Sequence, residues 1–119
     1  MTIKRIEAGP RMSQAVVHGD TVYLAGVVAD DPKQDVQGQT RQILAKIDKL
    51  LAAAGTDKSK VLSANIWLTD ISTWAKMNEV WDAWVSPGNT PARATVEAKL
   101  AAPAYKVEIM VQAAKLSAN

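Results

Sequence analysis

The sequence predicts an α+β domain of two layers, in which two helices cover one face of a mixed sheet of about six strands. Short β-rich runs lie near both ends of the chain, and each alternates side chains with the period of two that strands have. Two longer segments between them have helix periodicity, and a third β-rich run separates these helices. The resulting order is strand–strand–strand–helix–strand–helix–strand–strand, with a strand hairpin expected at each end, which is typical of helices packed on one side of a sheet.

Three short strands are predicted before the first helix: Ile3–Ala8, Gln14–His18 and Thr21–Ala25. Gly19-Asp20 separates the last two, and a two-residue loop with glycine between β-rich runs indicates a hairpin. Gly26 follows the third strand. A glycine there indicates a bulge or a place where a ligand or another backbone comes close.

The segment Val36–Ala54 has apolar residues three and four positions apart, which predicts an amphipathic helix lying on the sheet. Asp35 is expected to cap its start, and Gly55 is expected to end it in the left-handed conformation. The next segment, Val61–Thr69, is rich in β-branched and aromatic residues and predicts a strand.

A second helix is expected to begin at Asp70 or Ser72 and to run through Val85. Its expected buried stripe is Trp74, Met77, Trp81, Trp84 and Val85. Asn78 lies one turn from two of these tryptophans, so its amide should point near the buried side and needs hydrogen-bond partners there. Two interpretations stay open: the amide bonds to nearby backbone, or it shapes a pocket under the helix.

The C-terminal part contains two further extended segments, Ala92–Leu100 and Lys106–Val111. Apolar and polar residues alternate along both, so each strand has one apolar and one polar face. Arg93 lies between two alanines, and Pro91 stiffens the chain before it. A guanidinium in that setting can bind a carboxylate or phosphate through two parallel hydrogen bonds, although a solvated arginine at a strand start remains the alternative.

Composition limits the classes of function. The 119 residues predict one domain, with 48% hydrophobic and 22% charged residues as in an ordinary globular protein. Net charge is +2 and the basic residues are scattered, which gives weak support to nucleic-acid binding. Cysteine is absent and His18 is the single histidine, so no metal site is expected. No signal peptide or membrane span is evident, and we expect a cytoplasmic protein.

Two helices can hide only one face of the expected sheet. The other face carries small and apolar side chains, and exposed apolar surface of that size usually marks an interface. In so short a chain, we expect a second copy of the same chain to cover it, in a closed homo-oligomer.

The segment from Pro91 to Glu97, followed by Lys106-Val107-Glu108-Ile109, resembles the Rid (reactive intermediate deaminase) family, formerly called YjgF, and is closest to a small bacterial branch of it. The resemblance covers nearly all of the chain. It implies a chorismate-mutase-like fold assembled as a homotrimer, with clefts between subunits and no cofactor. It also implies hydrolysis of 2-imino or enamino acids, such as 2-aminoacrylate, to 2-keto acids and ammonia.

The same resemblance assigns roles to residues. Arg93 matches the arginine that binds the substrate carboxylate, Glu108 an acidic residue proposed to hold or activate water, and Asn78 a cleft asparagine. The remaining substrate-binding positions implied by it are Met12, Ala25, Gly26 and Thr95. Three of them depart from the best-known members, which carry tyrosine, serine and cysteine where this chain has the Arg11-Met12 pair, Ala25 and Thr95.

Three functions are therefore weighed. The first is imine or enamine hydrolysis, which needs little more than a held carboxylate and a placed water because the reaction is already easy in water. The second is a non-catalytic protein that binds or senses a small carboxylate in the same cleft, which the lost polar groups keep open. The third is RNA cleavage, an activity attached to some relatives, against which the lack of a basic stripe argues.

Overall fold

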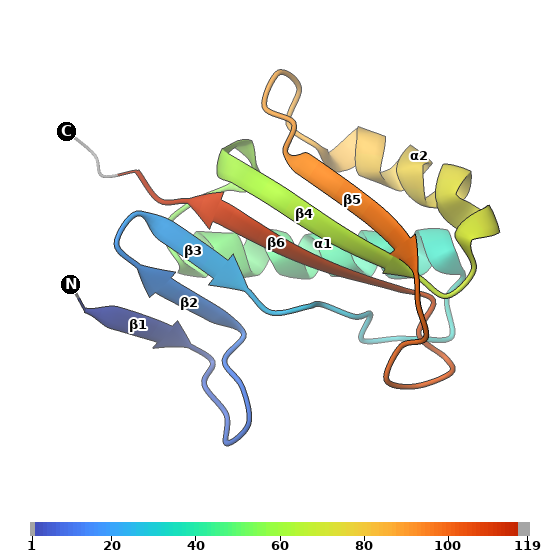
Figure 1. Ribbon diagram of the computed structural model, residues 1–119, viewed down its shortest axis with the longest axis horizontal. Helices are drawn as coiled ribbons and strands as arrows, with labels where there is room; N and C mark the ends of the chain where they lie inside the picture. The colour runs from blue at the N-terminus through green and yellow to red at the C-terminus, as the bar shows by residue number, and fades with distance from the viewer. Residues whose placement is uncertain (1, 117–119) are drawn as a thin grey trace.

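The computed structural model describes residues 2–116, which form one mixed β-sheet with two helices on one side (Figure 1). The strands are β1 (Ile3–Ile6), β2 (Ala15–His18), β3 (Thr21–Leu24), β4 (Val61–Leu68), β5 (Ala92–Glu97) and β6 (Val107–Ala114). The helices are α1 (Val36–Ala53) and α2 (Trp74–Trp84), and short 3₁₀ turns, η1 (Lys58–Lys60) and η2 (Ile71–Thr73), precede β4 and α2. The predicted two-layer α+β class is confirmed.

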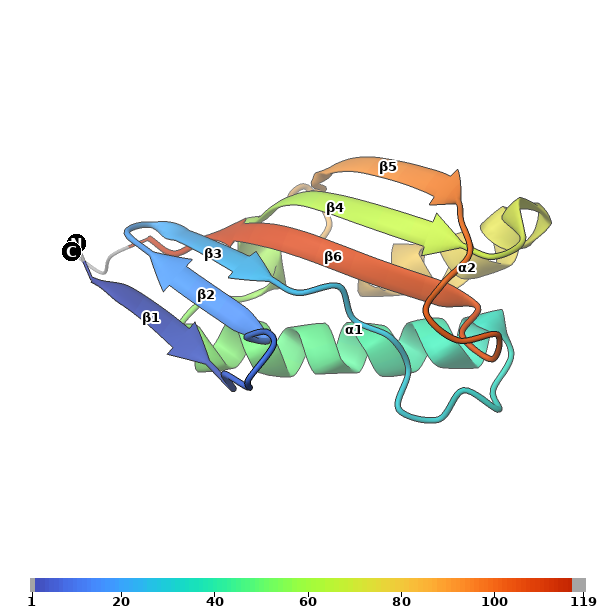
Figure 2. The ribbon, with the colours of Figure 1, turned by 60° about the horizontal axis from the view of Figure 1, so that its bottom comes forward.

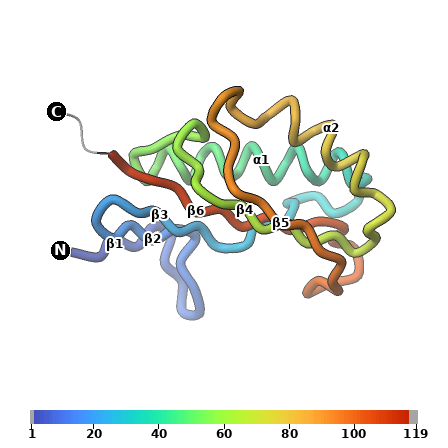
Figure 3. Tube along the Cα trace, turned by 45° about the horizontal axis from the view of Figure 1, so that its top comes forward, coloured from blue at the N-terminus to red at the C-terminus, as the bar shows by residue number. Residues whose placement is uncertain are grey.

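The six strands lie in the order β1-β2-β3-β6-β4-β5. β4 and β5 run parallel and the other neighbouring pairs run antiparallel, so the sheet is mixed as expected. Both helices lie on the same face of this sheet, with α1 beneath its centre and α2 beside the β4–β5 end (Figures 2 and 3). That arrangement leaves the opposite face, called the open face below, without a covering layer from residues 2–116.

Helix α1 supplies much of the core. Ile43, Ile47 and Leu51 are fully buried and recur at the spacing that places them on one side of the helix. The expected ends are confirmed: Asp35 accepts a hydrogen bond from the Gly38 amide at 2.8 Å, and Gly55 has a φ of 85°. No helix in residues 2–116 is both long enough and apolar enough to cross a bilayer.

The expected hairpin at the C-terminal end is wrong. β5 and β6 follow one another in the chain, but β4 lies between them and hydrogen-bonds to both. The reason is that α2 connects β4 to β5 as a crossover, which returns the chain to pair in parallel at the sheet edge. The loop from 98 to 106 then passes the end of β4 before β6 begins (Figure 1).

Strand β5 directs its polar side chains towards the helices and its apolar side chain outward, which is the reverse of the usual arrangement. Its polar residues Arg93 and Thr95 align with the buried Ala64 and Ile66 of β4, so they lie on the face that carries the helices. Its apolar residue Val96 is half exposed on the open face. Alternation predicted two unlike faces correctly, and the structure directs the polar one inward.

The predicted stripe of α2 is only partly buried. Met77 and Trp81 are buried and Trp84 packs against the core, but Trp74 is 49% exposed. Trp74 is the first residue of α2 and follows η2, whose start is capped by Asp70 through the Ser72 amide. The helix therefore enters the core only from its second turn, and the expectation of a buried Trp74 is wrong.

Candidate functional site

Arg93 lies on the edge strand with its side chain under α2. Nη1 donates a hydrogen bond to Oδ1 of Asn78 at 2.8 Å, and the side chain is half-buried. Within residues 2–116, no carboxylate lies within ion-pair distance of this guanidinium. A partly buried cation without a charged partner is a natural receptor for an anion, because its remaining N–H groups need acceptors.

Asn78 is held over Arg93 by the turn of α2 that also buries Met77 and Trp81. Its amide oxygen accepts the bond from Arg93, and no bond from its side chain to the backbone is found in the described part of the chain. Of the two interpretations left open by the sequence, this bond favours an amide that shapes a pocket under the helix over one that bonds to nearby backbone. It fixes the position of one guanidinium nitrogen.

Trp81 is a neighbour of Arg93 that the sequence did not single out beyond its burial. The Cζ atom of Arg93 lies 5.3 Å from the centre of the Trp81 ring, a cation–π arrangement. The sequence signal that could have found Trp81 is its spacing, since it follows Asn78 by three residues and so lies on the same side of the helix.

Thr95 lies two residues after Arg93 on the same face of β5. Its Oγ1 atom is buried and has no hydrogen-bond partner in the described structure. A buried hydroxyl without a partner costs about 1–3 kcal/mol, and a water, an ion or a ligand that accepts its proton would remove that cost. Arg93, Asn78, Trp81 and Thr95 are called the arginine cluster below.

Glu108 lies on the open face of β6, paired across the ladder with Trp67 of β4. Its side chain folds over Gly26, because a Cβ atom at Gly26 would collide with Oε2 and would lie 3.0 Å from Cδ of Glu108. The close neighbour of this glycine is thus the glutamate side chain, whereas a bulge, a ligand or another backbone was expected there. Ala25 adjoins it, and these three residues are called the glutamate cluster below.

The two clusters do not meet within one chain. Arg93 aligns with Ala64, which in turn aligns with Val111 of β6, whereas Glu108 lies three residues before Val111 in β6. Strand spacing and rise per residue put their Cα atoms roughly 14 Å apart, with the side chains on opposite faces. A small acid bound to Arg93 therefore cannot also reach Glu108 of the same chain.

Met12 belongs to neither cluster. It lies exposed in the loop between β1 and β2, where its carbonyl accepts a bond from the Gly9 amide. The strand order puts this loop at the end of the sheet opposite β5 (Figure 1). Any contact of Met12 with a ligand on Arg93 would again need a second chain.

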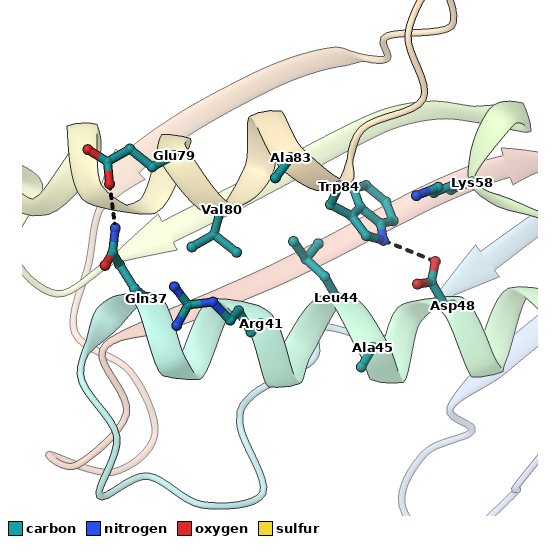
Figure 4. A pocket seen from close by; sticks show the side chains of 10 residues that line it. All are labelled: Gln37, Arg41, Leu44, Ala45, Asp48, Lys58, Glu79, Val80, Ala83 and Trp84. Carbon is teal, nitrogen blue, oxygen red and sulfur yellow. Dashed lines mark hydrogen bonds between the residues drawn. The ribbon is translucent and has the colours of Figure 1, made fainter.

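A separate groove of about 470 Å³ runs between α1 and α2 (Figure 4). Its apolar floor includes Leu44 and Val80. Both carboxylates on its rim are engaged: Asp48 accepts the Trp84 indole N–H at 3.0 Å, and Glu79 accepts the Gln37 amide at 2.8 Å. These bonds connect the two helices, and the groove contains neither cluster.

Comparison with known proteins identifies the family. The sequence model described as Endoribonuclease L-PSP matches residues 2–115. A RutC family protein, YoaB, of Escherichia coli is 46% identical over 114 residues, which is 96% of this chain and 99% of the relative. A RutC family protein of Haemophilus ducreyi is 44% identical over 112 residues, covering 94% of this chain and 96% of the relative.

Solved structures agree. A member of the YjgF protein family from Neisseria meningitidis superposes with a TM-score of 0.96 at 46% identity, covering 99% of this chain and 98% of that one. A member of the YjgF/YER057c/UK114 family from Mycobacterium tuberculosis superposes with a TM-score of 0.86 at 30% identity, covering 95% and 99%. The fold is therefore that of a small α+β protein of the YjgF type. The chain belongs to the YjgF (Rid) family, as the resemblance in its sequence predicted.

Proposed function

We propose that this protein hydrolyses reactive 2-imino and enamino acids, such as 2-aminoacrylate, to 2-keto acids and ammonia. The observation that supports this most is the arginine cluster, in which a half-buried guanidinium is held by Asn78 and has no carboxylate partner within residues 2–116. No cofactor is needed, because water is the only other reactant.

The substrate carboxylate would bind to Arg93. Nη1 donates to Asn78, and the Arg93 side chain makes no other hydrogen bond within residues 2–116. Nε and Nη2 are left, and together they form an edge that matches two carboxylate oxygens. Such charged hydrogen bonds contribute about 1.5–3 kcal/mol each, which is enough to orient a small acid.

Glu108 would then activate water. As general base it takes a proton from a water molecule while the oxygen adds to the imine carbon and the C=N electron pair moves to nitrogen. The proton is returned to nitrogen, which gives the carbinolamine. Glu108 then transfers the proton of the carbinolamine hydroxyl to the amine as the C–N bond breaks and the C=O bond forms, so that the keto acid and ammonia leave. An enamine first takes a proton on carbon and loses one from nitrogen, and so becomes the imine.

The two clusters would be joined by assembly. Because they lie on opposite faces of one sheet, a complete site needs the arginine cluster of one copy beside the glutamate cluster of another. The open face around Glu108 is suited to this contact, since Trp67 is half-buried there, Val96 is 50% exposed and Tyr23 is 43% exposed. A homotrimer with three such clefts has the closed symmetry that satisfies every copy equally.

The test uses imines made in place by an amino-acid oxidase, with keto-acid and ammonia release followed above the uncatalysed rate. We expect Arg93→Ala to abolish the enzymatic part while the oligomer persists. Arg41→Ala is the matched control, because Arg41 is an exposed arginine on the helix α1 and should leave turnover unchanged. Unchanged turnover in Arg93→Ala would refute the proposal.

A second candidate is a non-catalytic protein that binds small carboxylates. It is favoured by the fact that the arginine cluster is complete within one chain, whereas Glu108 is remote. In that case 2-oxobutyrate would raise the stability of the wild type, by about 2.7 kcal/mol at one hundred times its Kd, and this effect would need Arg93. No imino acid in the panel would then be turned over.

A further inference from the structure

We propose that Trp81 is a positioning residue for Arg93, whose ring fixes the plane of the guanidinium so that its free edge faces the substrate carboxylate. This inference rests on the proposed carboxylate site and adds to it a residue outside the set that the family resemblance implies. It has a geometric basis that does not depend on turnover.

The contact is close and well supported. The guanidinium carbon lies 5.3 Å from the ring centre, and Trp81 itself is only 5% exposed. Trp84 packs against Trp81 with ring centres 5.2 Å apart and planes tilted by 51°. A ring that is buried and packed against a second ring cannot turn away, so it offers Arg93 a fixed surface.

The hydrogen bond to Asn78 alone would leave Arg93 too free. One bond fixes one nitrogen, and the guanidinium can still rotate about that bond in the space beside an edge strand. The Trp81 ring, whose centre lies 5.3 Å from Cζ of Arg93, restricts this rotation, because a guanidinium gains most when its plane lies against the ring. Two constraints of different kinds therefore define both the position and the plane.

This arrangement predicts a particular kinetic effect. Pre-organised binding groups lower the entropy lost on binding, and the carboxylate does not change during imine hydrolysis. Its contact with Arg93 is therefore about as strong in the ground state as in the transition state, so loosening it raises KM and leaves kcat nearly unchanged.

The experiment measures 2-oxobutyrate binding by calorimetry and imine kinetics for the wild type, Trp81→Tyr, Trp81→Leu and Val80→Ala. Trp81→Leu should raise Kd and KM roughly three- to thirtyfold with kcat within twofold, which is the range of a cation–π contact. Trp81→Tyr keeps an aromatic face and should stay within threefold of the wild type. Val80→Ala removes buried volume from the same helix without touching the arginine, so it should lower stability and leave Kd unchanged.

Nitrogen NMR of the arginine side chains gives a second readout. In the wild type the Arg93 Nε–H signal should be shifted by the ring and ordered, and both features should be lost in Trp81→Leu. Unchanged affinity in Trp81→Leu, or an Arg93 signal as ordered as in the wild type, would overturn the inference. If Trp81→Leu does not fold, Trp81→Met is judged by the same criteria.

The two proposals fail differently. A wild type that neither binds 2-oxobutyrate nor hydrolyses imines refutes the proposed function, and the NMR readout then decides the Trp81–Arg93 contact alone. A wild type that does both, with an unaffected Trp81→Leu variant, refutes only the role of Trp81.

Discussion

Arg93 and Asn78 are joined by a hydrogen bond of 2.8 Å from Nη1 to Oδ1, which connects the edge strand β5 to the helix α2 that precedes it. The bond is made between two residues fifteen positions apart, on elements that the crossover brings together. A first prediction follows from it.

Asn78→Asp should weaken carboxylate binding more than Asn78→Ala. The aspartate puts a negative charge where the neutral oxygen accepts from Arg93, and a charge-assisted bond of about 1.5–3 kcal/mol then competes with the substrate. We expect an affinity loss of at least about tenfold for Asn78→Asp and a smaller loss for Asn78→Ala, measured by calorimetry with 2-oxobutyrate. Equal affinity in Asn78→Asp and the wild type would show that Arg93 does not meet the ligand charge.

Gly26→Ala should lower turnover with little effect on stability. The added methyl group displaces the carboxylate end of Glu108, which is a flexible end that can move. Because general-base catalysis contributes about 10²–10⁴-fold, a displaced base should lower kcat on the order of 10- to 100-fold.

Gly9→Ala is the control for Gly26→Ala, since its Cβ atom would make only an ordinary contact of 3.5 Å with the Met12 carbonyl. Thermal unfolding of both variants should lie close to that of the wild type. A fully active Gly26→Ala would mean that the position of the Glu108 carboxylate does not matter to the reaction.

Thr95→Val should separate stability from binding. Its Oγ1 atom is buried without a partner in the described structure, so replacing the hydroxyl with a methyl group should raise the free energy of unfolding by about 1 kcal/mol. If the hydroxyl serves the ligand, affinity for 2-oxobutyrate should fall roughly three- to tenfold in the same variant. Thr95→Ser keeps the hydroxyl and should keep the affinity. Urea unfolding and calorimetry measure the two effects, and a Thr95→Val variant that loses stability would indicate an unseen partner.

Mixed oligomers should recover activity. Arg93→Ala and Glu108→Gln are each expected to be inactive alone, but unfolding and refolding them together at equal amounts creates interfaces that combine both intact residues. In a cyclic trimer about a quarter of the interfaces would do so, and the mixture should regain about that share of wild-type turnover. No recovery, with mixing verified by mass spectrometry, would place both residues in one chain's own site and contradict the shared cleft.

The helices and strands can be predicted from local sequence patterns, whereas the order in which the strands pair cannot. Periodicity and caps defined α1 almost to its ends, because an amphipathic stripe and a capping aspartate act within a few residues. The order of β4, β5 and β6 depends on where a crossover returns the chain, and nothing local in Ala92–Glu97 states that it pairs with β4. The alternation within β5 was evident, but the choice of inward face was not.

The candidate site shows the same division. Arg93 and Asn78 could be found because a lone arginine between small residues and an amide among tryptophans are both unusual. Trp81 was assigned to the core, which is right for its burial, but its contact with a strand eleven or more residues later is not visible in a helical pattern. The separation of Arg93 from Glu108 onto opposite faces depends on the register of three strands, and no sequence spacing encodes it.

The uncovered apolar side of the sheet has a consequence for handling the protein. Within residues 2–116, Val96 is exposed on the edge strand β5, whose outer row of backbone groups pairs with no other strand, and Tyr23 is exposed on the inner strand β3; such surfaces adhere to one another. Dilution below the dissociation constant of the oligomer should therefore lower the proposed activity of each chain, so that specific activity falls with concentration before the polypeptide itself unfolds.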